Sequence, residues 1–390
     1  MKRITLILIG IVSILAIWLV ISCFRWEKLP RTSHSIYILD KTVSSSNYSE
    51  HKSLFWVLSN LRFEKPNKTP YQLNKDYYGF IPIDAEHGTF DFRTIRLAQI
   101  ERYADSLDAV YYVDCYGVYS ESWTISKNRP LGEKVYGGLN QNDYLLLKAM
   151  KERGKMIVAE HNLFSSTGGG LVKEKLSELF GFTWTGWIGR SYSSFDTTKL
   201  DRPPSWVVSI YFAEHGSWPN DKGGVIFAKD RDQVVLLFDE KHLTNSRVSV
   251  VSTPSTVKEF GVKTNVPFTD WFEIIETEPA FSIFSTFSMN LTSEGSAVLT
   301  KNGIPETFPA AIGYSNGYQL YYFAGDFSHT PAYMFCSEMI NGAVINKCIS
   351  TVVRPRGFAF FNDYYRPFIS KVLTSYTPPI GSADSLETSN

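Results

Sequence analysis

The chain has 390 residues, enough for one large domain or two of ordinary size. Its 39 Lys and Arg residues balance 39 Asp and Glu residues, so no bulk positive field attracts nucleic acid, and we expect no nucleic-acid partner. Aromatic residues make up 15% and charged residues 20% of the chain, which supplies an apolar core and argues against global disorder. The 4 cysteines include no C-x-x-C pair, which excludes a disulfide-dense scaffold.

The N-terminal segment predicts attachment to a membrane. Residues 4–23 are uncharged and rich in Leu, Ile and Val, and a helix of roughly 20 residues spans ~30 Å, the thickness of the hydrocarbon core of a bilayer. We therefore favour an uncleaved transmembrane anchor over residues 1–26, with membrane lipid as the partner of residues 4–23. A lipoprotein signal is the alternative, because Val-Ile-Ser-Cys at 20–23 resembles a lipobox with Cys23 as the lipidated residue. Under either interpretation we expect a membrane-anchored, single-pass protein with an extracytoplasmic body in a bacterial envelope.

After a linker at 27–34, the first half alternates short apolar runs with amphipathic segments. The expected strands are 35–39, 77–83, 109–113 and 155–159, and the expected helices are 51–61, 94–104, 140–153 and 168–180. The helix at 140–153 begins at an Asn cap. This alternation predicts a parallel sheet with helices on both faces.

The second half predicts antiparallel strands. They are expected at 206–213, 224–228, 233–238, 248–251, 296–300, 308–313 and 318–324, and Asn316-Gly317 is a hairpin signal between the last two. A helix is expected at 363–373. We place one α/β domain at 35–376 with a β-rich insertion at about 200–295, and a disordered tail at 377–390 that carries few apolar residues.

Two segments carry a resemblance to a known family. Residues 139–170 read as a helix, a short strand and a sharp turn, and residues 322–327 read Tyr-Phe-Ala-Gly-Asp-Phe. These phrases resemble parts of the class I glutamine amidotransferase-like fold, over about half of the chain (35–180 and 296–328). The resemblance implies an α/β fold with a flavodoxin-like parallel sheet flanked by helices. Here that sheet would be elaborated by the β-rich antiparallel insertion and the N-terminal transmembrane helix.

The family's nucleophile is missing from this chain. Where the family has Gly-x-Cys-x-Gly, residues 158–162 read Val-Ala-Glu-His-Asn. Without a thiolate to attack a glutamine amide, glutaminase activity is not expected. Cys115 precedes this turn by one strand, and we interpret it as a buried structural thiol, with a displaced nucleophile as the alternative. If 331–350 is one helix, Cys336 and Cys348 lie ~18 Å apart, beyond disulfide reach.

The tripeptide Ala-Glu-His occurs three times, at 85–87, 159–161 and 213–215, each time after an apolar run. Because ligand crevices of open α/β sheets lie beyond the carboxyl ends of strands, at least two of these pairs could come together there, with His161 facing the crevice. Imidazole and carboxylate groups suit a divalent metal such as zinc or a general base. The alternative is that polar residues end strands because strands end at the surface, and we assign no metal ligand and no cofactor. The candidate catalytic residues are Glu86, His87, Glu160, His161, Glu214 and His215.

The small-residue run Ser-Ser-Thr-Gly-Gly-Gly at 165–170 precedes an expected helix. It could present backbone N–H groups to a phosphate or carboxylate, although a connector with a helix cap is the preferred interpretation. The candidate ligand-binding residues are Asn162, Ser165, Ser166 and Asp326, with His329 close to Asp326. Aromatic residues in the middle of the chain could stack on sugars or pack in the core; they are Trp184, Trp187, Tyr192, Trp206 and Trp218.

The function expected from these features is a non-catalytic ligand-binding or assembly module on an amidotransferase-like fold, with an envelope protein or a glycan as partner. The alternative is a metal-dependent or acid–base hydrolase that uses the Glu–His pairs at strand ends.

Overall fold

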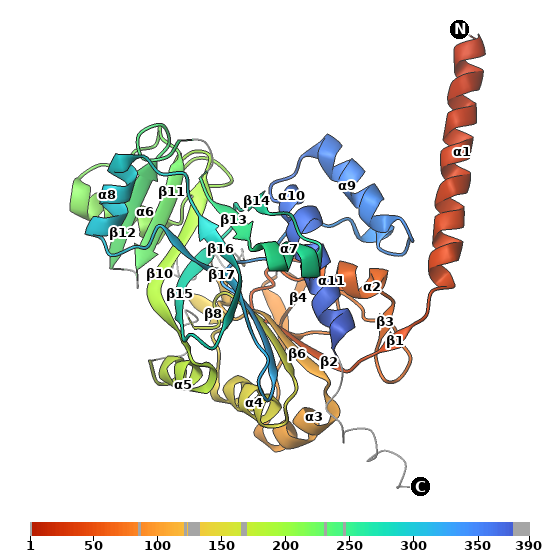
Figure 1. Ribbon diagram of the computed structural model, residues 1–390, viewed down its shortest axis with the longest axis horizontal. Coiled ribbons are helices and arrows are strands. Elements are labelled where there is room, and N and C mark those ends of the chain that lie inside the picture. Colours follow the sequence, from red (N-terminus) through yellow and green to blue (C-terminus); the bar gives the residue numbers. More distant parts are fainter. Residues whose placement is uncertain are drawn as a thin grey trace.

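The computed structural model describes residues 2–84, 87–120, 123, 133–164, 170–229, 232–244 and 247–376. Helix α1 (Lys2–Glu27) projects from the body of the molecule (Figure 1). Within it, Ile9–Glu27 is long and apolar enough to cross a membrane, a test that a signal sequence also passes. The expected tail at 377–390 lies outside the described residues.

The main sheet contains ten strands in the order β14-β13-β16-β17-β18-β9-β6-β2-β4-β5. Its strands are β2 (Ile36–Asp40), β4 (Tyr78–Asp84), β5 (Thr89–Arg93), β6 (Ala109–Asp114), β9 (Met156–Glu160), β13 (Ser249–Ser252), β14 (Asn265–Pro267), β16 (Ser282–Ser288), β17 (Thr307–Tyr314) and β18 (Gln319–Phe323). The five neighbours β18, β9, β6, β2 and β4 are parallel. The strands outside them pair antiparallel. The mixed α/β class is thus confirmed, with a central mixed sheet in place of a wholly parallel one.

Helices cover both faces of this sheet, which explains why β2, β6 and β9 are buried along their whole length. Helices α3 (Ile100–Ser106), α4 (Gln141–Glu152) and α5 (Gly170–Phe180) lie along one side (Figure 1). On the other side are α2 (Lys52–Asn60), α7 (Pro254–Phe260), α9 (Gly342–Val353), α10 (Phe358–Phe360) and α11 (Arg366–Ser375). Three single turns complete this part: η1 (Leu97–Gln99), η2 (Met334–Cys336) and η3 (Phe361–Tyr365).

A second, antiparallel sheet has the order β12-β11-β10-β15. It consists of β10 (Phe182–Tyr192), β11 (Gly224–Lys229), β12 (Gln233–Phe238) and β15 (Phe272–Thr277). Helix α6 (Ser205–His215) packs on β12 around a small separate core, and α8 (Ser293–Lys301) lies nearby (Figure 1). The remaining short pairs are β1 (Thr32–Ser33) with β3 (Phe63–Glu64) and β7 (Val118–Tyr119) with β8 (Lys134–Tyr136).

Two expected strands are helices. The run at 206–213 lies in α6, which ends at Gly216 in the left-handed region (φ +72°), and the run at 296–300 lies in α8. Helix α8 begins at Thr292, whose hydroxyl accepts a hydrogen bond from the Gly295 N–H. A short apolar run does not distinguish strand from helix without such end signals.

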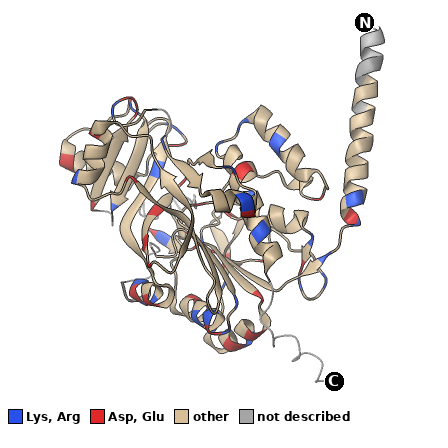
Figure 2. Ribbon diagram, in the orientation of Figure 1, with Lys and Arg blue, Asp and Glu red and all other residues tan. Residues whose placement is uncertain are grey.

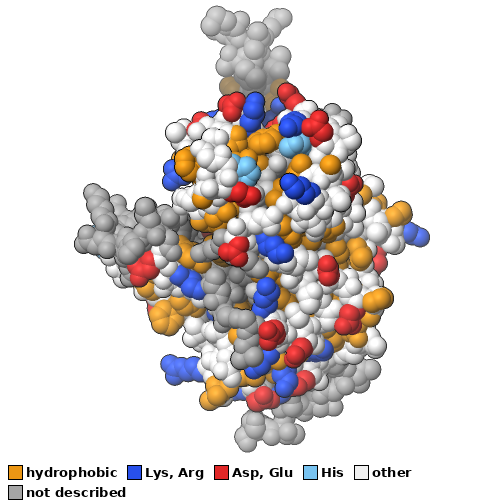
Figure 3. All heavy atoms as spheres, turned by 90° about the vertical axis from the view of Figure 1, so that its left-hand side faces the viewer, with side chains coloured by type: hydrophobic (Ala, Val, Ile, Leu, Met, Phe, Trp, Pro, Cys, Tyr) orange, Lys and Arg blue, Asp and Glu red, His pale blue; other side chains and the backbone are white. Residues whose placement is uncertain are grey.

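Residues 331–350 are not one helix, because the segment contains the short turn η2 and the first part of α9. Cys336 is buried, Cys348 is exposed, and both are free thiols. On the face of the molecule seen in Figure 3, acidic and basic side chains are interspersed, in keeping with the zero net charge.

Candidate functional site

Acidic residues gather at the carboxyl edge of the parallel strands. Strands β2, β6 and β9 end at Asp40, Asp114 and Glu160, and Asp326 follows β18. The carboxyl ends of parallel strands share one edge, which is where open α/β sheets bind ligands. All four side chains are buried, so each needs a hydrogen-bonding or charged partner.

Both carboxylate oxygens of Glu160 accept hydrogen bonds from other residues of the protein. Its Oε1 accepts a hydrogen bond from the Tyr111 hydroxyl at 2.6 Å, and its Oε2 accepts from the backbone N–H groups of Phe327 and Ser328, each at 2.9 Å. Burial raises the pKa of Glu160 to about 8, although the hydrogen bonds from Tyr111 and Ser328 oppose the shift. Glu160 therefore holds in place the turn that carries Asp326 and His329.

His161 and Asn162 follow Glu160 and lie at the centre of the edge. Asn162 adopts a left-handed backbone conformation (φ +67°), which Asn tolerates better than most residues. Its amide Nδ2 donates to Asp114 Oδ1 at 3.1 Å and lies 2.9 Å from His161 Nε2. If Nε2 accepts from this amide, the neutral imidazole carries its proton on Nδ1. That nitrogen is buried and has no hydrogen-bond partner among the residues that the structure describes.

His161 is 3% exposed, so it is less open to a crevice than we expected. Burial lowers its pKa, and the charges of Asp326 and Asp270 oppose the shift. The unpartnered Nδ1–H therefore lies in a negative environment. Burial, together with the charges of Asp326 and Asp40, raises the pKa of Asp114 well above its ordinary value.

Among the described residues, Asp270, Asp326 and His329 form a cluster that could hold a metal ion. Each offers one ligand atom, and these atoms lie within 4.8 Å of one another. His329 Nδ1 lies 3.1 Å from Asp326 Oδ2; the Asp326 side chain is buried and that of His329 is 39% exposed. One imidazole nitrogen and two carboxylate oxygens are donors that divalent transition metals accept.

The charges within the cluster compensate one another. Burial alone would lower the pKa of His329, but the charge of Asp326 and its hydrogen bond raise it to about 10. Burial alone would raise the pKa of Asp326, but His161 and His329 hold it below its ordinary value. A cation at this site would have to displace the proton of His329.

Arg190, from β10, supplies a further positive charge. It forms ion pairs with Asp270 at 3.3 Å and Asp201 at 3.2 Å, and its guanidinium lies over the rings of Tyr192 and Trp271. Strand β10 of the second sheet thus contributes Arg190, and Asp270 lies in the loop that leads from β14 into β15 of that sheet.

Two other buried ion pairs lie near this edge, and the basic residue of each has a second hydrogen-bond partner in the protein. His51 contacts Asp40 Oδ2 through Nδ1 at 2.7 Å and the Leu73 carbonyl through Nε2 at 3.1 Å. Lys41 Nζ donates to Asp143 and to the carbonyl oxygen of Gly138. These pairs are structural, because their hydrogen-bonding capacity is used within the protein.

The other predicted site residues lie elsewhere. His87 is exposed in the β4–β5 turn and pairs with Asp84 at 2.7 Å, whereas Glu86, Ser165 and Ser166 lie outside the described residues. Glu214 and His215 are exposed at the end of α6, where the His215 ring stacks on Tyr211. The described histidines of the three Ala-Glu-His tripeptides do not gather at one edge.

Sequence reasoning missed Asp114, Asp270 and Arg190. Asp114 carried a usable signal, because it ends a buried apolar strand as Glu160 does. Asp270 and Arg190 carried none, since they reach the site from the second sheet. Of the candidate sugar-stacking aromatics, Trp187 and Tyr192 are buried in the core.

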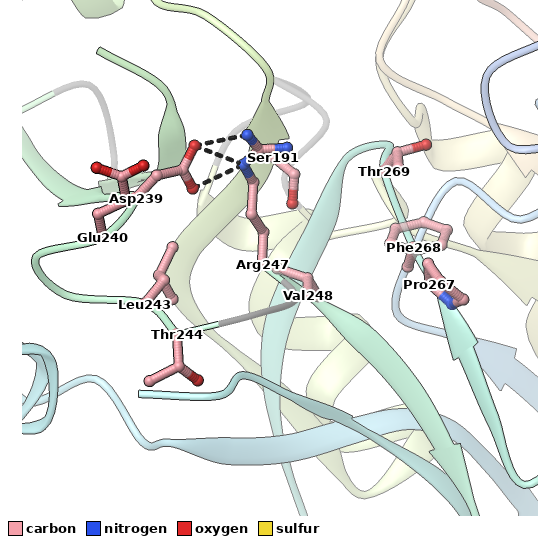
Figure 4. Close-up of a pocket in the computed structure, with 10 residues that line it drawn as sticks. All are labelled: Ser191, Asp239, Glu240, Leu243, Thr244, Arg247, Val248, Pro267, Phe268 and Thr269. Atoms are coloured by element: carbon pink, nitrogen blue, oxygen red, sulfur yellow. Dashed lines mark hydrogen bonds and ion pairs between the residues drawn. The ribbon is translucent and has the colours of Figure 1, made fainter. Parts of the chain in front are cut away.

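A separate cavity of about 320 Å³ lies beside the second sheet (Figure 4). Its walls include the ion pair between Arg247 and Asp239, with Nε and Oδ1 2.9 Å apart. They also include Ser191, whose buried hydroxyl has no hydrogen-bond partner within the described part of the chain. Ser191 neighbours Arg190 on β10, and successive residues of a strand point to opposite faces, so this cavity is distinct from the acidic cluster. The lining residues are Ser191, Asp239, Glu240, Leu243, Thr244, Arg247, Val248, Pro267, Phe268 and Thr269.

No protein-family model matches the chain, and no curated protein matches it. Among solved structures, it is similar to a ThuA-like protein from Bacteroides uniformis ATCC 8492 (9% identity, TM-score 0.34, 77% of this chain and 83% of that one). It is also similar to β-galactosidases from Rahnella sp. R3 (11% identity, TM-score 0.32, 83% of this chain and 32% of that one) and from Bacillus circulans sp. alkalophilus (9%, 0.34, 82% and 31%). The chain spans about a third of the length of these two β-galactosidases. At such TM-scores these similarities assign neither a family nor an activity.

Proposed function

We propose that this protein is a membrane-anchored, extracytoplasmic and non-catalytic binding module on a flavodoxin-like, amidotransferase-like fold. The order of the parallel strands supports this fold. Numbered along the chain, β4-β2-β6-β9-β18 corresponds to 2-1-3-4-5, the order of flavodoxin-like sheets. In that arrangement the order in which strands are added to the sheet reverses between the neighbours β2 and β6. The last residues of these two strands are Asp40 and Asp114.

The ligand that we propose for this module is a divalent transition-metal cation held by Asp270, Asp326 and His329. The observation that carries the proposal is the convergence of three donor atoms within 4.8 Å at the carboxyl edge. The half-exposed His329 leaves the cluster accessible from solvent, while Glu160 and Arg190 hold the two sides of the site in place.

The alternative function is a metal-dependent hydrolase. Three protein ligands leave a coordination position for water, as in catalytic zinc sites, where the metal lowers the pKa of the bound water. The unpartnered Nδ1–H of His161 supports this alternative, because it could donate a hydrogen bond to an oxygen atom in the site.

The test is a calorimetric titration of the detergent-solubilised full-length protein with Zn²⁺ and Mn²⁺. We expect one equivalent to bind the wild type and Asp326→Asn to weaken binding at least about tenfold, the loss typical when a site loses supporting groups. Asp363→Asn is the matched control, because Asp363 is a carboxylate with little exposure (12%) that forms ion pairs with Lys263 and Lys347 and is not part of the cluster. Absence of binding to the wild type, or equal binding by Asp326→Asn, would contradict the proposal.

Hydrolysis assays on ester and phosphoester substrates separate the two functions. A metal-dependent activity that Asp326→Asn abolishes would replace the binding module with the hydrolase. Metal binding without turnover supports the binding module.

A further inference from the structure

Helix α9 shows the reverse of the polarity expected for a helix on the surface of a soluble domain. Its buried positions are Gly342, Asn346 and Ser350, which are small or polar. Its outward positions include Val344, 59% exposed, and Val352, 83% exposed. A surface helix normally buries its apolar stripe and exposes its polar residues.

The inward face of α9 is held by specific contacts, so this orientation is built into the fold. Asn346 Oδ1 accepts from the Tyr333 N–H at 2.9 Å, and Asn346 Nδ2 donates to Asn362 Oδ1 at 3.1 Å. At the start of the helix, a Cβ on Gly342 would clash with the carbonyl oxygen of Cys336. Turning the apolar face inward would break both contacts.

The outward apolar residues form a continuous stripe. Val344, Cys348 and Val352 recur every fourth residue, the spacing of one helix face, and all three are exposed, as is Ile340 in the turn that leads into α9. Val353 and, in the preceding turn η2, Phe335 are also exposed. We call this set of residues the α9 face: Phe335, Ile340, Val344, Cys348, Val352 and Val353.

The α9 face begins where α1 meets the body of the protein. The backbone N–H of Ile340 donates to the Ser22 carbonyl at 3.3 Å, and the N–H of Asn341 donates to the Ser22 hydroxyl at 3.4 Å. Ser22 lies within the apolar segment of α1 that is long enough to cross a membrane. The body therefore contacts α1 at a level that would lie at the membrane boundary.

The end of α1 is also tied to the body on a second side. Trp26 Nε1 donates to the Asn60 carbonyl at 3.0 Å, and Arg62 donates to the carbonyl of Trp26 at 3.1 Å while lying over its ring. Arg25, near this end, and Arg354, at the end of α9, are exposed cations. Figure 2 shows α9 without charged residues apart from a basic one near its middle, and α1 without charged residues between its grey part and its last turn.

We propose that the α9 face lies in the interfacial layer of the same bilayer that α1 enters, with lipid as its occupant. This inference rests on the anchoring proposed above. An amphipathic helix in this position buries its apolar face about 5–10 Å into the boundary between headgroups and acyl chains. Arg25 and Arg354 would then meet lipid phosphates. The contact makes α9 a second attachment point, which fixes how the carboxyl-edge site is oriented relative to the membrane.

The free thiol of Cys348 allows a direct test. In Cys23→Ala protein the remaining Cys115 and Cys336 are buried, so an environment-sensitive maleimide dye labels Cys348. The labelled full-length protein is reconstituted into vesicles of phosphatidylcholine and phosphatidylglycerol. We expect a blue-shifted emission and quenching by lipids that carry a nitroxide on the acyl chain. The matched control carries the dye at Ser209→Cys, an exposed position of α6, in a Cys23→Ala, Cys348→Ala background, and should be neither shifted nor quenched.

Carbonate extraction of the same vesicles shows separately whether α1 spans the bilayer, because carbonate releases proteins that do not span it. Protein that stays in the vesicles while the dye on Cys348 is unquenched would overturn the α9 proposal and leave the anchor intact. Protein released by carbonate would overturn the spanning anchor and this inference with it. A blue shift without lipid quenching would show that protein, such as a second copy of the chain, covers the α9 face, which also overturns the proposal.

Discussion

Glu160 illustrates how a residue at a ligand-binding edge can serve the structure instead of the ligand. Its two oxygens accept three hydrogen bonds, from Tyr111 and from the backbone of Phe327 and Ser328. The residue that follows it, His161, keeps an unpartnered Nδ1. At this strand end, Glu160 positions the turn that carries His329, and the next residue, His161, lies near the acidic residues Asp326 and Asp270.

We expect Glu160→Ala to lower the free energy of unfolding by ~2–4 kcal/mol, because it leaves a buried hydroxyl and two buried N–H groups without an acceptor. Glu160→Gln retains an acceptor oxygen and should cost less. Urea unfolding of the detergent-solubilised protein measures both values. His87→Ala, at an exposed position, serves as the control and should change the unfolding free energy by no more than about 0.5 kcal/mol. Equal losses for the Ala and Gln variants would contradict this role of Glu160.

At the scale of elements, the start of helix α4 is an end signal that the sequence pattern predicted correctly. Helix α4 begins at Asn140, whose side chain accepts from the N–H groups of Asn142 at 2.9 Å and Asp143 at 3.1 Å. Asp143 reciprocates by accepting from the Asn140 N–H. Helix α6, by contrast, starts after Pro204 without a side-chain cap, and its apolar run was interpreted as a strand.

Removal of the α4 cap should destabilise the protein measurably. We expect Asn140→Ala to cost ~1 kcal/mol, because two backbone N–H groups lose their acceptor, and Asn140→Ser to recover most of that loss. The midpoint of urea unfolding at constant slope measures the change. A Ser variant as unstable as the Ala variant would show that the cap contributes nothing and that another role of Asn140 is responsible.

At the scale of the whole molecule, two buried carboxyl groups couple stability to pH. Burial raises the pKa of Glu273 to about 7, against a hydrogen bond from Tyr322, and that of Glu160 to about 8. The ordinary value for both is near 4.5. Between pH 4.5 and these values the folded state binds more protons than the unfolded state, so stability falls as pH rises.

We therefore expect the free energy of unfolding to decline from pH 5 to pH 8, with each group contributing at most ~1.4 kcal/mol per pH unit. Glu273→Gln and Glu160→Gln should each reduce this slope, since neither variant titrates at that position. Glu214→Gln, on the exposed end of α6, should leave the slope unchanged. Stability that rises over this range in the wild type would contradict the raised pKa values.

The strand alternation, the Asn140 cap and the apolar N-terminal helix were all predictable from the sequence. Each depends on residues within one or two turns or within one strand, so the local pattern carries the information. The carboxyl-edge residues Glu160, His161, Asn162 and Asp326 were predicted for the same reason, because each follows a buried apolar run. The third Ala-Glu-His tripeptide does not lie at this edge, because it ends helix α6, which packs on the second sheet.

The sequence by itself determined the buried strands β2, β6 and β9 and the polar residues that end them, since burial along a strand follows from local side-chain chemistry. Tertiary structure alone decided that Asp270 meets Asp326 and His329, because they reach the site from different sheets. It also decided which side of α9 turns inward. The packing of Gly342 against Cys336 and the hydrogen bonds of Asn346 hold the polar side against the body. A helical periodicity gives the spacing of a face and says nothing about what that face meets.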